Sequence, residues 1–194
     1  LLPAAFTAAY GICFVMSVLY SVPPFRFKAV AGVDWLINMI GFGALTPYAG
    51  WAVTGRPADR PIVLVFAAFA PLFAALYPLT QIYQFEEDRR RGDRTLALML
   101  GERASLLLAL AAAVVAFVMF GLAGAGRGWS MLSPAGGWRI GLLAVAFLAW
   151  MVVLLPWLVR CRTMTPAEHQ RGMYAALAAW AVTDVAVAVG FGLG

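Results

Sequence analysis

The side chains best suited to chemistry gather in one stretch of the sequence, between Gln81 and Leu96. If a helix runs through it as far as Asp88, the spacing i, i+3 and i+7 places Gln81, Gln84 and Asp88 on one helix face. Carboxylate and amide oxygens suit a hard cation such as Mg²⁺, which often binds through one or two carboxylates together with substrate phosphates. The arginine run that begins at Arg89 could bind phosphate oxygens in bidentate geometry. The alternative is a solvated charged loop with local ion pairs.

A second group of candidate residues lies at positions 20 to 28, where Pro23 and Pro24 end an apolar helical run. Arg26 and Lys28 alternate with two phenylalanines, so an extended chain points both cations to one side and both rings to the other. Cations that face an anion and rings that face lipid suit a lipid diphosphate. The alternative is a positively charged loop with an aromatic anchor at the membrane interface.

The composition identifies an integral membrane protein. Of the 194 residues, 63% are hydrophobic and 12% are charged, and the mean hydropathy is +0.86. Soluble domains are close to half apolar and a quarter charged. The same composition excludes a disordered chain, a collagen-like repeat and a disulfide-stabilised secreted module. The two cysteines show no spacing typical of a metal or redox site.

Apolar segments of about 20 residues, long enough to cross a membrane as a helix, divide the chain. Six are expected, at roughly 3–22, 35–54, 62–83, 104–122, 138–159 and 173–193. Their apolar runs are continuous and do not alternate, which argues against a β-barrel. We therefore predict an all-α fold: one transmembrane domain, a polytopic helical bundle, over the whole sequence.

The distribution of lysine and arginine predicts the orientation of this bundle. The first, third and fifth loops hold more of these residues than the second and fourth, and positively charged loops remain on the cytoplasmic side. The odd-numbered loops are therefore expected to be cytoplasmic, and the net charge of +5 reflects topology and implies no nucleic-acid partner. The excess of arginine over lysine and the abundant alanine and glycine indicate a microbial genome, so we expect a prokaryotic cytoplasmic membrane.

Taken together, the two groups of candidate residues resemble the motifs of the UbiA-type intramembrane prenyltransferase superfamily. Tyr20 and Ser21 begin the pattern Tyr-Ser-x-Pro-Pro-x-Arg-x-Lys. Residues 86–101 read Glu-Glu-Asp-Arg-Arg-Arg-Gly-Asp-Arg-Thr-Leu-Ala-Leu-x-Leu-Gly, which is similar to the second acidic motif of that family, including its Gly-x-x-Thr-Leu tail. The order, the spacing and the predicted side of the membrane agree with the family.

The resemblance implies a nine-helix bundle and an enzyme, a prenyltransferase. Its central cavity would bind Mg²⁺ and an isoprenyl diphosphate, ionise the diphosphate and transfer the prenyl group to a lipophilic acceptor. By motif position, Asp88 corresponds to the second aspartate of an Asp-x-x-x-Asp metal motif. The diphosphate-side loop of the family corresponds to Tyr20, Ser21, Arg26 and Lys28.

Two departures from the family pattern change these expectations. Gln84 stands four residues before Asp88, where many members have aspartate, so Glu87 or Glu86 is expected to supply the missing carboxylate. The first acidic motif of the family is absent, and the sequence opens at Leu1 with an apolar run. We therefore expect further helices upstream and no prenyl transfer by this stretch alone.

The alternative function is non-catalytic: a UbiA-like membrane subunit that holds a lipid or pigment within a larger complex of membrane proteins. Gln84 and the missing first motif motivate it. A small transporter is not favoured, because no internal repeat of interrupted helices is visible.

Three further polar residues need their own interpretation. Asp184 lies in the middle of the last predicted span, where a charge is costly, so we expect either a buried hydrogen bond between helices or a role in a cavity. Asn38 is expected to form a hydrogen bond between helices. His169 follows Pro166 in a polar loop and is expected at the solvated surface.

Overall fold

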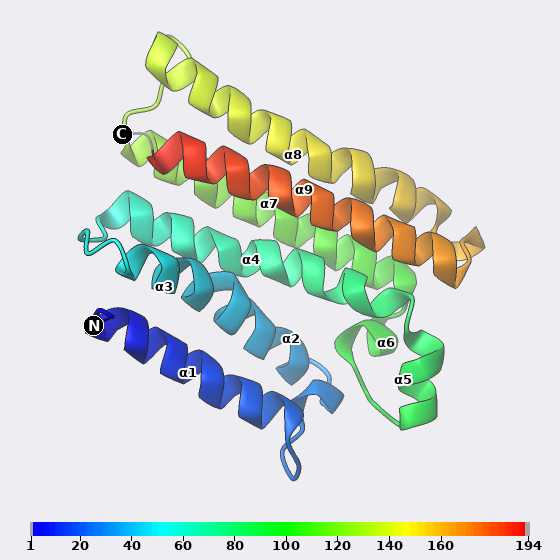
Figure 1. Ribbon diagram of the computed structural model, residues 1–194. Helices are drawn as coiled ribbons and strands as arrows, with labels where there is room; N and C mark the ends of the chain where they lie inside the picture. Colours follow the sequence, from blue (N-terminus) through cyan, green and yellow to red (C-terminus); the bar gives the residue numbers. More distant parts are fainter. Residues whose placement is uncertain (1, 193–194) are drawn as a thin grey trace.

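The computed structural model describes residues 2–192, which fold into helices joined by short turns without a β-sheet. Five of these helices are long and apolar enough to cross a membrane. They are α1 (Ala4–Ser21), α4 (Arg60–Ile82), α7 (Glu102–Gly126), α8 (Pro134–Arg160) and α9 (Pro166–Gly192). They lie side by side in a bundle (Figure 1), which confirms the predicted polytopic helical fold. Residue 193, at the end of the last predicted span, lies outside the described residues.

The second predicted span, residues 35–54, is helical but divided, so it differs from the other five. Its elements are α2 (Val33–Asn38), the π-helical segment η2 (Met39–Leu45) and α3 (Thr46–Ala52). Gly43 in η2 packs directly against α4, since a Cβ atom there would lie only 2.7 Å from the Cα of Ala70. Only glycine permits this approach of η2 to its neighbour.

Helix α4 occupies the centre of the bundle, in contact with α2, η2, α7 and α9, and its C-terminal half is largely buried. Pro71 and Pro78 lie inside it. A proline within a helix removes the hydrogen bond to the carbonyl four residues earlier. For Pro78 this is the carbonyl of Ala74, whose oxygen accepts a hydrogen bond of 3.0 Å from Nε1 of Trp35 in α2. The bond satisfies a group that the proline would otherwise leave unpaired.

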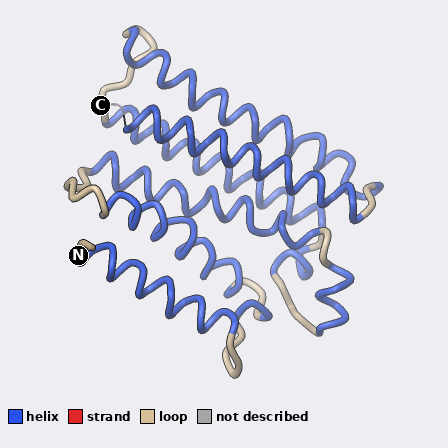
Figure 2. Tube along the Cα trace, viewed as in Figure 1, coloured by secondary structure: helices blue, strands red, loops and turns tan. Residues whose placement is uncertain are grey.

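The connections rich in charge share one end of the bundle. Figure 1 places the α1–α2, α4–α7 and α8–α9 connections at one end, and the N-terminus with the α3–α4 and α7–α8 connections at the other. Figure 2 shows the loops confined to these two ends. The charged end also carries short helices: η1 (Phe27–Ala29), α5 (Phe85–Arg91), α6 (Leu96–Leu100) and η3 (Cys161–Thr163). The odd-numbered loops therefore lie on the same side of the bundle.

Candidate functional site

The chain bends after α4, and the bend corrects one prediction. No single helix continues to Asp88, because a two-residue turn separates α4 from α5. The cause is Gln84: its backbone N–H bonds the carbonyl of Gln81, and its side-chain Nε2 donates over 3.0 Å to the carbonyl of Thr80. A side chain that takes the carbonyl four residues back competes with the helical hydrogen bond. The helix therefore ends there.

The bend nevertheless brings the predicted oxygen ligands together around one small cavity of about 230 Å³ at the charged end of the bundle. Its lining residues, called the polar site below, are Tyr20, Lys28, Tyr77, Thr80, Gln81, Gln84, Asp88, Arg91, Asp93 and Thr95. They come from the end of α1, η1, the end of α4, α5 and the turn before α6. Four of them, Tyr20, Lys28, Gln84 and Asp88, were predicted as site residues from the sequence.

Asp88 is buried in the wall of the polar site, with 5% of its surface exposed. The Thr95 hydroxyl donates to its Oδ2 over 3.4 Å. Burial raises the pKa of the Asp88 carboxyl most strongly, the hydrogen bond from Thr95 lowers this pKa, and the neighbouring Asp93 carboxylate raises it again. Two carboxylates so close together in a buried place form an environment that a cation stabilises.

Asp93 is a site residue that the sequence reasoning missed. Its side chain is 7% exposed, and Nη2 of Arg26 lies 3.1 Å from Oδ1 and 3.3 Å from Oδ2. Oδ1 is buried and accepts no well-aligned hydrogen bond from the described residues. The sequence could have pointed to Asp93 through its position. It directly follows Gly92, which ends α5 in a left-handed conformation, and it precedes the residues that start α6.

Asp34 is the second residue that was missed, and it supports the polar site without lining the cavity. It is fully buried in the first turn of α2. Its Oδ2 accepts hydrogen bonds from Nε2 of Gln81 at 2.9 Å and from the backbone N–H of Leu96 at 3.2 Å. One carboxylate thus ties α2, α4 and α6 together. The signal was an acidic residue immediately before the expected span 35–54.

The two glutamines have different roles around the cavity. Both ends of the Gln81 amide are occupied, because Nε2 donates to Asp34 and Oε1 accepts from the N–H of Ala97 at 3.3 Å. Gln84 uses only its Nε2, on the carbonyl of Thr80, and its Oε1 accepts no hydrogen bond from the described residues. Gln81 is therefore structural, whereas the oxygen of Gln84 is free to act as a ligand.

Four predicted site residues lie outside the cavity lining, and one of them, Arg26, stands at its edge through its contact with Asp93. Glu86 and Glu87, the two carboxylates expected to stand in for Gln84, are both exposed on α5, where they form ion pairs with Arg90 and Arg91. Arg89 is exposed and its guanidinium lies 5.9 Å from the centre of the Phe85 ring. Ser21, the last residue of α1, is also exposed. The carboxylate that the structure brings near Asp88 in the cavity wall is that of Asp93, on the far side of Gly92.

The donor set of the polar site fits a hard cation. Asp88 and Asp93 supply carboxylates, Gln84 supplies a free amide oxygen, and one carboxylate oxygen is buried without an aligned hydrogen bond. Within residues 2–192, no three His, Cys, Asp or Glu side chains converge as a metal-binding group. A cation held by these oxygens would need water or substrate phosphates to complete its coordination.

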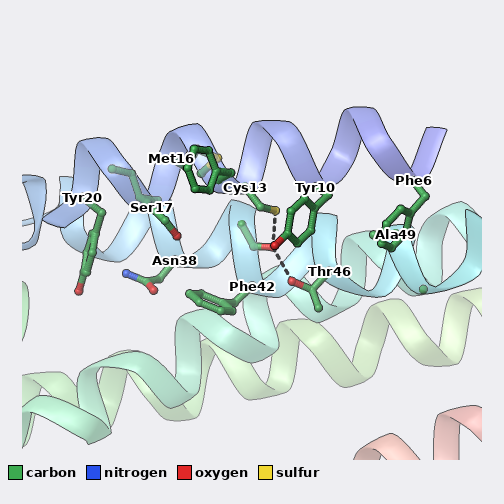
Figure 3. A pocket seen from close by; sticks show the side chains of 14 residues that line it. Phe6, Tyr10, Cys13, Met16, Ser17, Tyr20, Asn38, Phe42, Thr46 and Ala49 are labelled. Atoms are coloured by element: carbon green, nitrogen blue, oxygen red, sulfur yellow. Dashed lines mark hydrogen bonds between the residues drawn. The ribbon is translucent and has the colours of Figure 1, made fainter. Parts of the chain in front are cut away.

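An apolar groove of about 560 Å³ runs along α1 (Figure 3). It lies between α1 and the α2–η2–α3 segment, from Phe6 near one end of α1 to Tyr20 at the other. The carbonyl of Gly41 in its wall accepts hydrogen bonds from the Thr46 hydroxyl at 3.0 Å and the Cys13 thiol at 3.8 Å. Tyr20 lines both cavities, and its hydroxyl is 2.7 Å from that of Tyr77.

The structure corrects the prediction for His169, which is 2% exposed and not solvated. Helix α9 begins at Pro166, earlier than expected, so His169 faces α8, where its Nδ1 accepts a hydrogen bond of 2.8 Å from Nε1 of Trp157. Gly172, one turn further, leaves room for the Trp157 ring, since a Cβ there would lie 2.8 Å from it.

The other two polar residues within the spans bond within their own helices. Nδ2 of Asn38 donates a hydrogen bond of 2.8 Å to the carbonyl of Asp34, one turn earlier in the same helix. The predicted bond between helices is therefore wrong. Asp184 bonds Trp180 in α9 and lines a cavity of about 290 Å³ beside α3 and α4. Of the two alternatives for Asp184, the structure favours the cavity.

A comparison with protein families decides the identity of this arrangement. The model of the UbiA prenyltransferase family matches residues 1–189 of the chain. The chain belongs to the UbiA prenyltransferase family. The resemblance seen in the sequence motifs is thereby confirmed, and with the five long apolar helices the family membership identifies an integral membrane protein.

Two curated relatives of this UbiA-family chain are similar over about half of its length. It is 34% identical over 107 residues to a lycopene elongase/hydratase of Haloferax volcanii. It is 31% identical over 108 residues to a chloroplastic 2-acyl-4-prenylphloroglucinol 6-prenyltransferase of Humulus lupulus. The matches cover 55% and 53% of this chain but 34% and 26% of the relatives. No solved structure matches the chain significantly.

Proposed function

We propose that this UbiA-family protein is a prenyltransferase that uses Mg²⁺ and an isoprenyl diphosphate and transfers the prenyl group to a lipophilic acceptor. Family membership and the two relatives support a prenyltransferase. The observation that carries the proposal is that a small polar cavity and a long apolar groove share one lining residue, Tyr20. An isoprenyl diphosphate has the matching shape, a charged head on an apolar tail.

The charges around the polar site support this assignment of the head group. Lys28 and Arg91 line the cavity as phosphate-binding cations, and Arg26 stands beside it, paired with Asp93. Asp88, Asp93 and Gln84 would hold the cation. When bound there, Mg²⁺ would neutralise charge on the departing diphosphate.

The groove supports the assignment of the tail. Tyr20 lies fourteen positions after Phe6 along α1, a length of about 21 Å at the helical rise per residue. Its apolar walls would exclude water while the bond between C1 and the diphosphate oxygen breaks and the electron pair leaves with the diphosphate. The acceptor then supplies the electron pair for the new bond to C1 and releases a proton.

The test is metal-dependent turnover by the natural full-length protein in detergent. Isoprenyl diphosphates of increasing length serve as donors, with a lipid extract of the same cells as acceptor, and both released diphosphate and prenylated product are measured. We expect Asp88→Ala to lower turnover at least a hundredfold. The matched control is Glu86→Ala, because Glu86 lies on the same helix but is exposed and pairs with Arg90. Full activity of Asp88→Ala contradicts the proposal.

The second candidate is a non-catalytic subunit that holds a lipid within a complex of membrane proteins. The observation in its favour is Gln84, an uncharged ligand where a second carboxylate of the motif would stand. Tight binding of the isoprenyl diphosphate without release of diphosphate, by the full-length protein with Mg²⁺, would favour this candidate over the enzyme.

We also propose that the charged end of the bundle faces the cytoplasm of a prokaryotic cell, because the odd-numbered loops hold most of the arginines. In a variant without the native cysteines, Arg90→Cys should react with a membrane-impermeant thiol reagent only after the cells are opened. Arg56→Cys, on an exposed even-numbered loop, is the matched control and should react in intact cells. The reverse pattern contradicts the orientation.

A further inference from the structure

An ion pair at the edge of the polar site joins two segments far apart in the sequence. Arg26 follows α1 and Asp93 follows α5, 67 positions later. Nη2 of Arg26 contacts both carboxylate oxygens, at 3.1 and 3.3 Å. The two ends of the pair differ, because the side chain of Asp93 is 7% exposed and that of Arg26 is 39% exposed. The buried carboxylate stays in the wall of the cavity, while the arginine has room to move.

The backbone holds these two segments together without help from the ion pair. The N–H of Arg94 donates to the carbonyl of Ala29 over 3.2 Å, and Val30 forms an isolated parallel β-bridge with Arg94. The Arg26 side chain can therefore change partners while the loop that carries it remains docked. Arg26 also has φ 39° and ψ 52°, a left-handed conformation that is uncommon for a residue with a Cβ atom and persists where the surroundings hold it.

The neighbouring charges explain the position of Arg26. Asp93 lies near the second buried carboxylate, Asp88. Removing the partner of a buried charge is strongly destabilising, so Asp93 requires a cation beside it when no metal ion is bound. Arg26 supplies that charge.

We infer that Arg26 and Asp93 pair with each other until substrate binds, and that each then changes to a new partner. Arg26 turns to an oxygen of the diphosphate, and the released Asp93 carboxylate joins Asp88 in facing the divalent cation. The charges are matched before and after the exchange, and no covalent bond changes. The inference rests on the proposed function, since it requires a diphosphate in the polar site.

The exchange predicts two opposite effects of Asp93→Asn, one on metal-free pyrophosphate affinity and one on the gain in affinity that Mg²⁺ causes. In Asp93→Asn, Arg26 has no competing partner, so inorganic pyrophosphate without metal should bind about three- to tenfold more tightly than to the natural protein. The same variant lacks a carboxylate for the cation, so the gain in pyrophosphate affinity caused by Mg²⁺ should become smaller. Titration calorimetry on the full-length protein in detergent measures both quantities.

Replacing Arg26, the more exposed member of the pair, tests the inference independently. Arg26→Gln should weaken metal-free pyrophosphate binding by a similar factor. It should also strengthen binding of Mg²⁺ alone, because Asp93 is then free to face the metal ion. Because the Arg26 side chain is 39% exposed, its replacement leaves no cavity in the core, and the glutamine amide can still donate a hydrogen bond to the buried Asp93 carboxylate. This arm is measured independently of Asp93→Asn.

The double variant separates partner exchange from a general charge effect. Asp93→Asn removes a negative charge near an anion site and would favour pyrophosphate in any case. If exchange is correct, Asp93→Asn changes metal-free affinity much less when Arg26 is already Gln. An equal gain in both backgrounds overturns the inference. Glu86→Gln is the matched control, an exposed acid on α5 that does not line the cavity.

The failure of this inference differs from the failure of the proposed function. If pyrophosphate binds to the natural protein and Asp93→Asn leaves both the metal-free affinity and the Mg²⁺ effect unchanged, the exchange is wrong and the diphosphate site stands. If pyrophosphate binds to none of the variants, with or without Mg²⁺, both are overturned. Tighter metal-free binding combined with a smaller Mg²⁺ effect supports the exchange.

Discussion

Nε1 of Trp35 donates a hydrogen bond of 3.0 Å to the carbonyl oxygen of Ala74, the oxygen that Pro78 leaves without its helical partner. The bond joins α2 to the buried half of α4, immediately behind the polar site. Within a membrane bundle no water is available to replace such a partner. A tryptophan from a neighbouring helix is therefore what allows a proline in the most buried part of the fold.

Trp35→Phe should lower the stability of the protein by about 1–3 kcal/mol, because a buried carbonyl loses its donor. Thermal unfolding in detergent measures the change. Pro78→Ala restores a backbone N–H four residues after Ala74, so in that background the same substitution should cost clearly less. Equal costs with and without Pro78 would show that the indole matters only through packing.

Asp34 is expected to determine the order of the segment that carries Asp93. Its Oδ2 accepts from both Gln81 and the N–H of Leu96, and its Oδ1 accepts from the N–H of Gly32, so Asp34→Ala leaves three donors without their acceptor. We expect amide hydrogen exchange across residues 93–97 to accelerate at least tenfold, with a loss of turnover, while exchange in α8 stays unchanged. Glu86→Ala serves as the control. Unchanged exchange across 93–97 would mean that the backbone contacts alone hold the segment.

The sequence was sufficient to predict the helical membrane fold, since apolar length alone requires it, and the motif pattern located Tyr20, Lys28, Gln84 and Asp88. It failed where tertiary contacts decided the outcome. The helix through Asp88 broke because the side chain of Gln84 took a backbone carbonyl. Such competition depends on conformation and leaves no mark in hydrophobic periodicity.

The missed and misassigned residues have a common cause. Asp34 and Asp93 gain their roles from partners 47 to 67 positions away in the sequence. Local spacing favoured Glu87 because it is adjacent to Asp88, yet on a helix adjacent residues point in different directions. His169 was assigned to a loop because α9 begins before the apolar run does.

The apolar groove predicts a dependence on prenyl chain length. Ser17→Trp places a large ring in the groove between its two ends, so donors with long chains should lose far more affinity than those with short chains, by at least tenfold. Val15→Trp is the matched control, because Val15 lies on the same helix, is 56% exposed and does not line the groove. Competition binding with isoprenyl diphosphates of graded length measures both. An equal loss at every length would place the tail elsewhere.

The buried carboxyl of Asp88 predicts a gain in stability when its charge is removed. Burial raises the pKa of Asp88 in the folded protein above the ordinary value of 3.8, so ionisation favours the unfolded chain, and the folded state is penalised above the raised pKa. At neutral pH and without Mg²⁺, Asp88→Asn should therefore melt higher than the natural protein, by about 2–4 °C. The difference should shrink as the pH falls below the raised pKa, and it should vanish below the ordinary value of 3.8, where the carboxyl is protonated in both states. The control Glu86→Gln should show no such trend. Added Mg²⁺ should stabilise the natural protein and leave the variant unchanged. A lower melting temperature for Asp88→Asn at neutral pH would mean that neighbouring groups already stabilise the Asp88 carboxylate and that it does not need a cation.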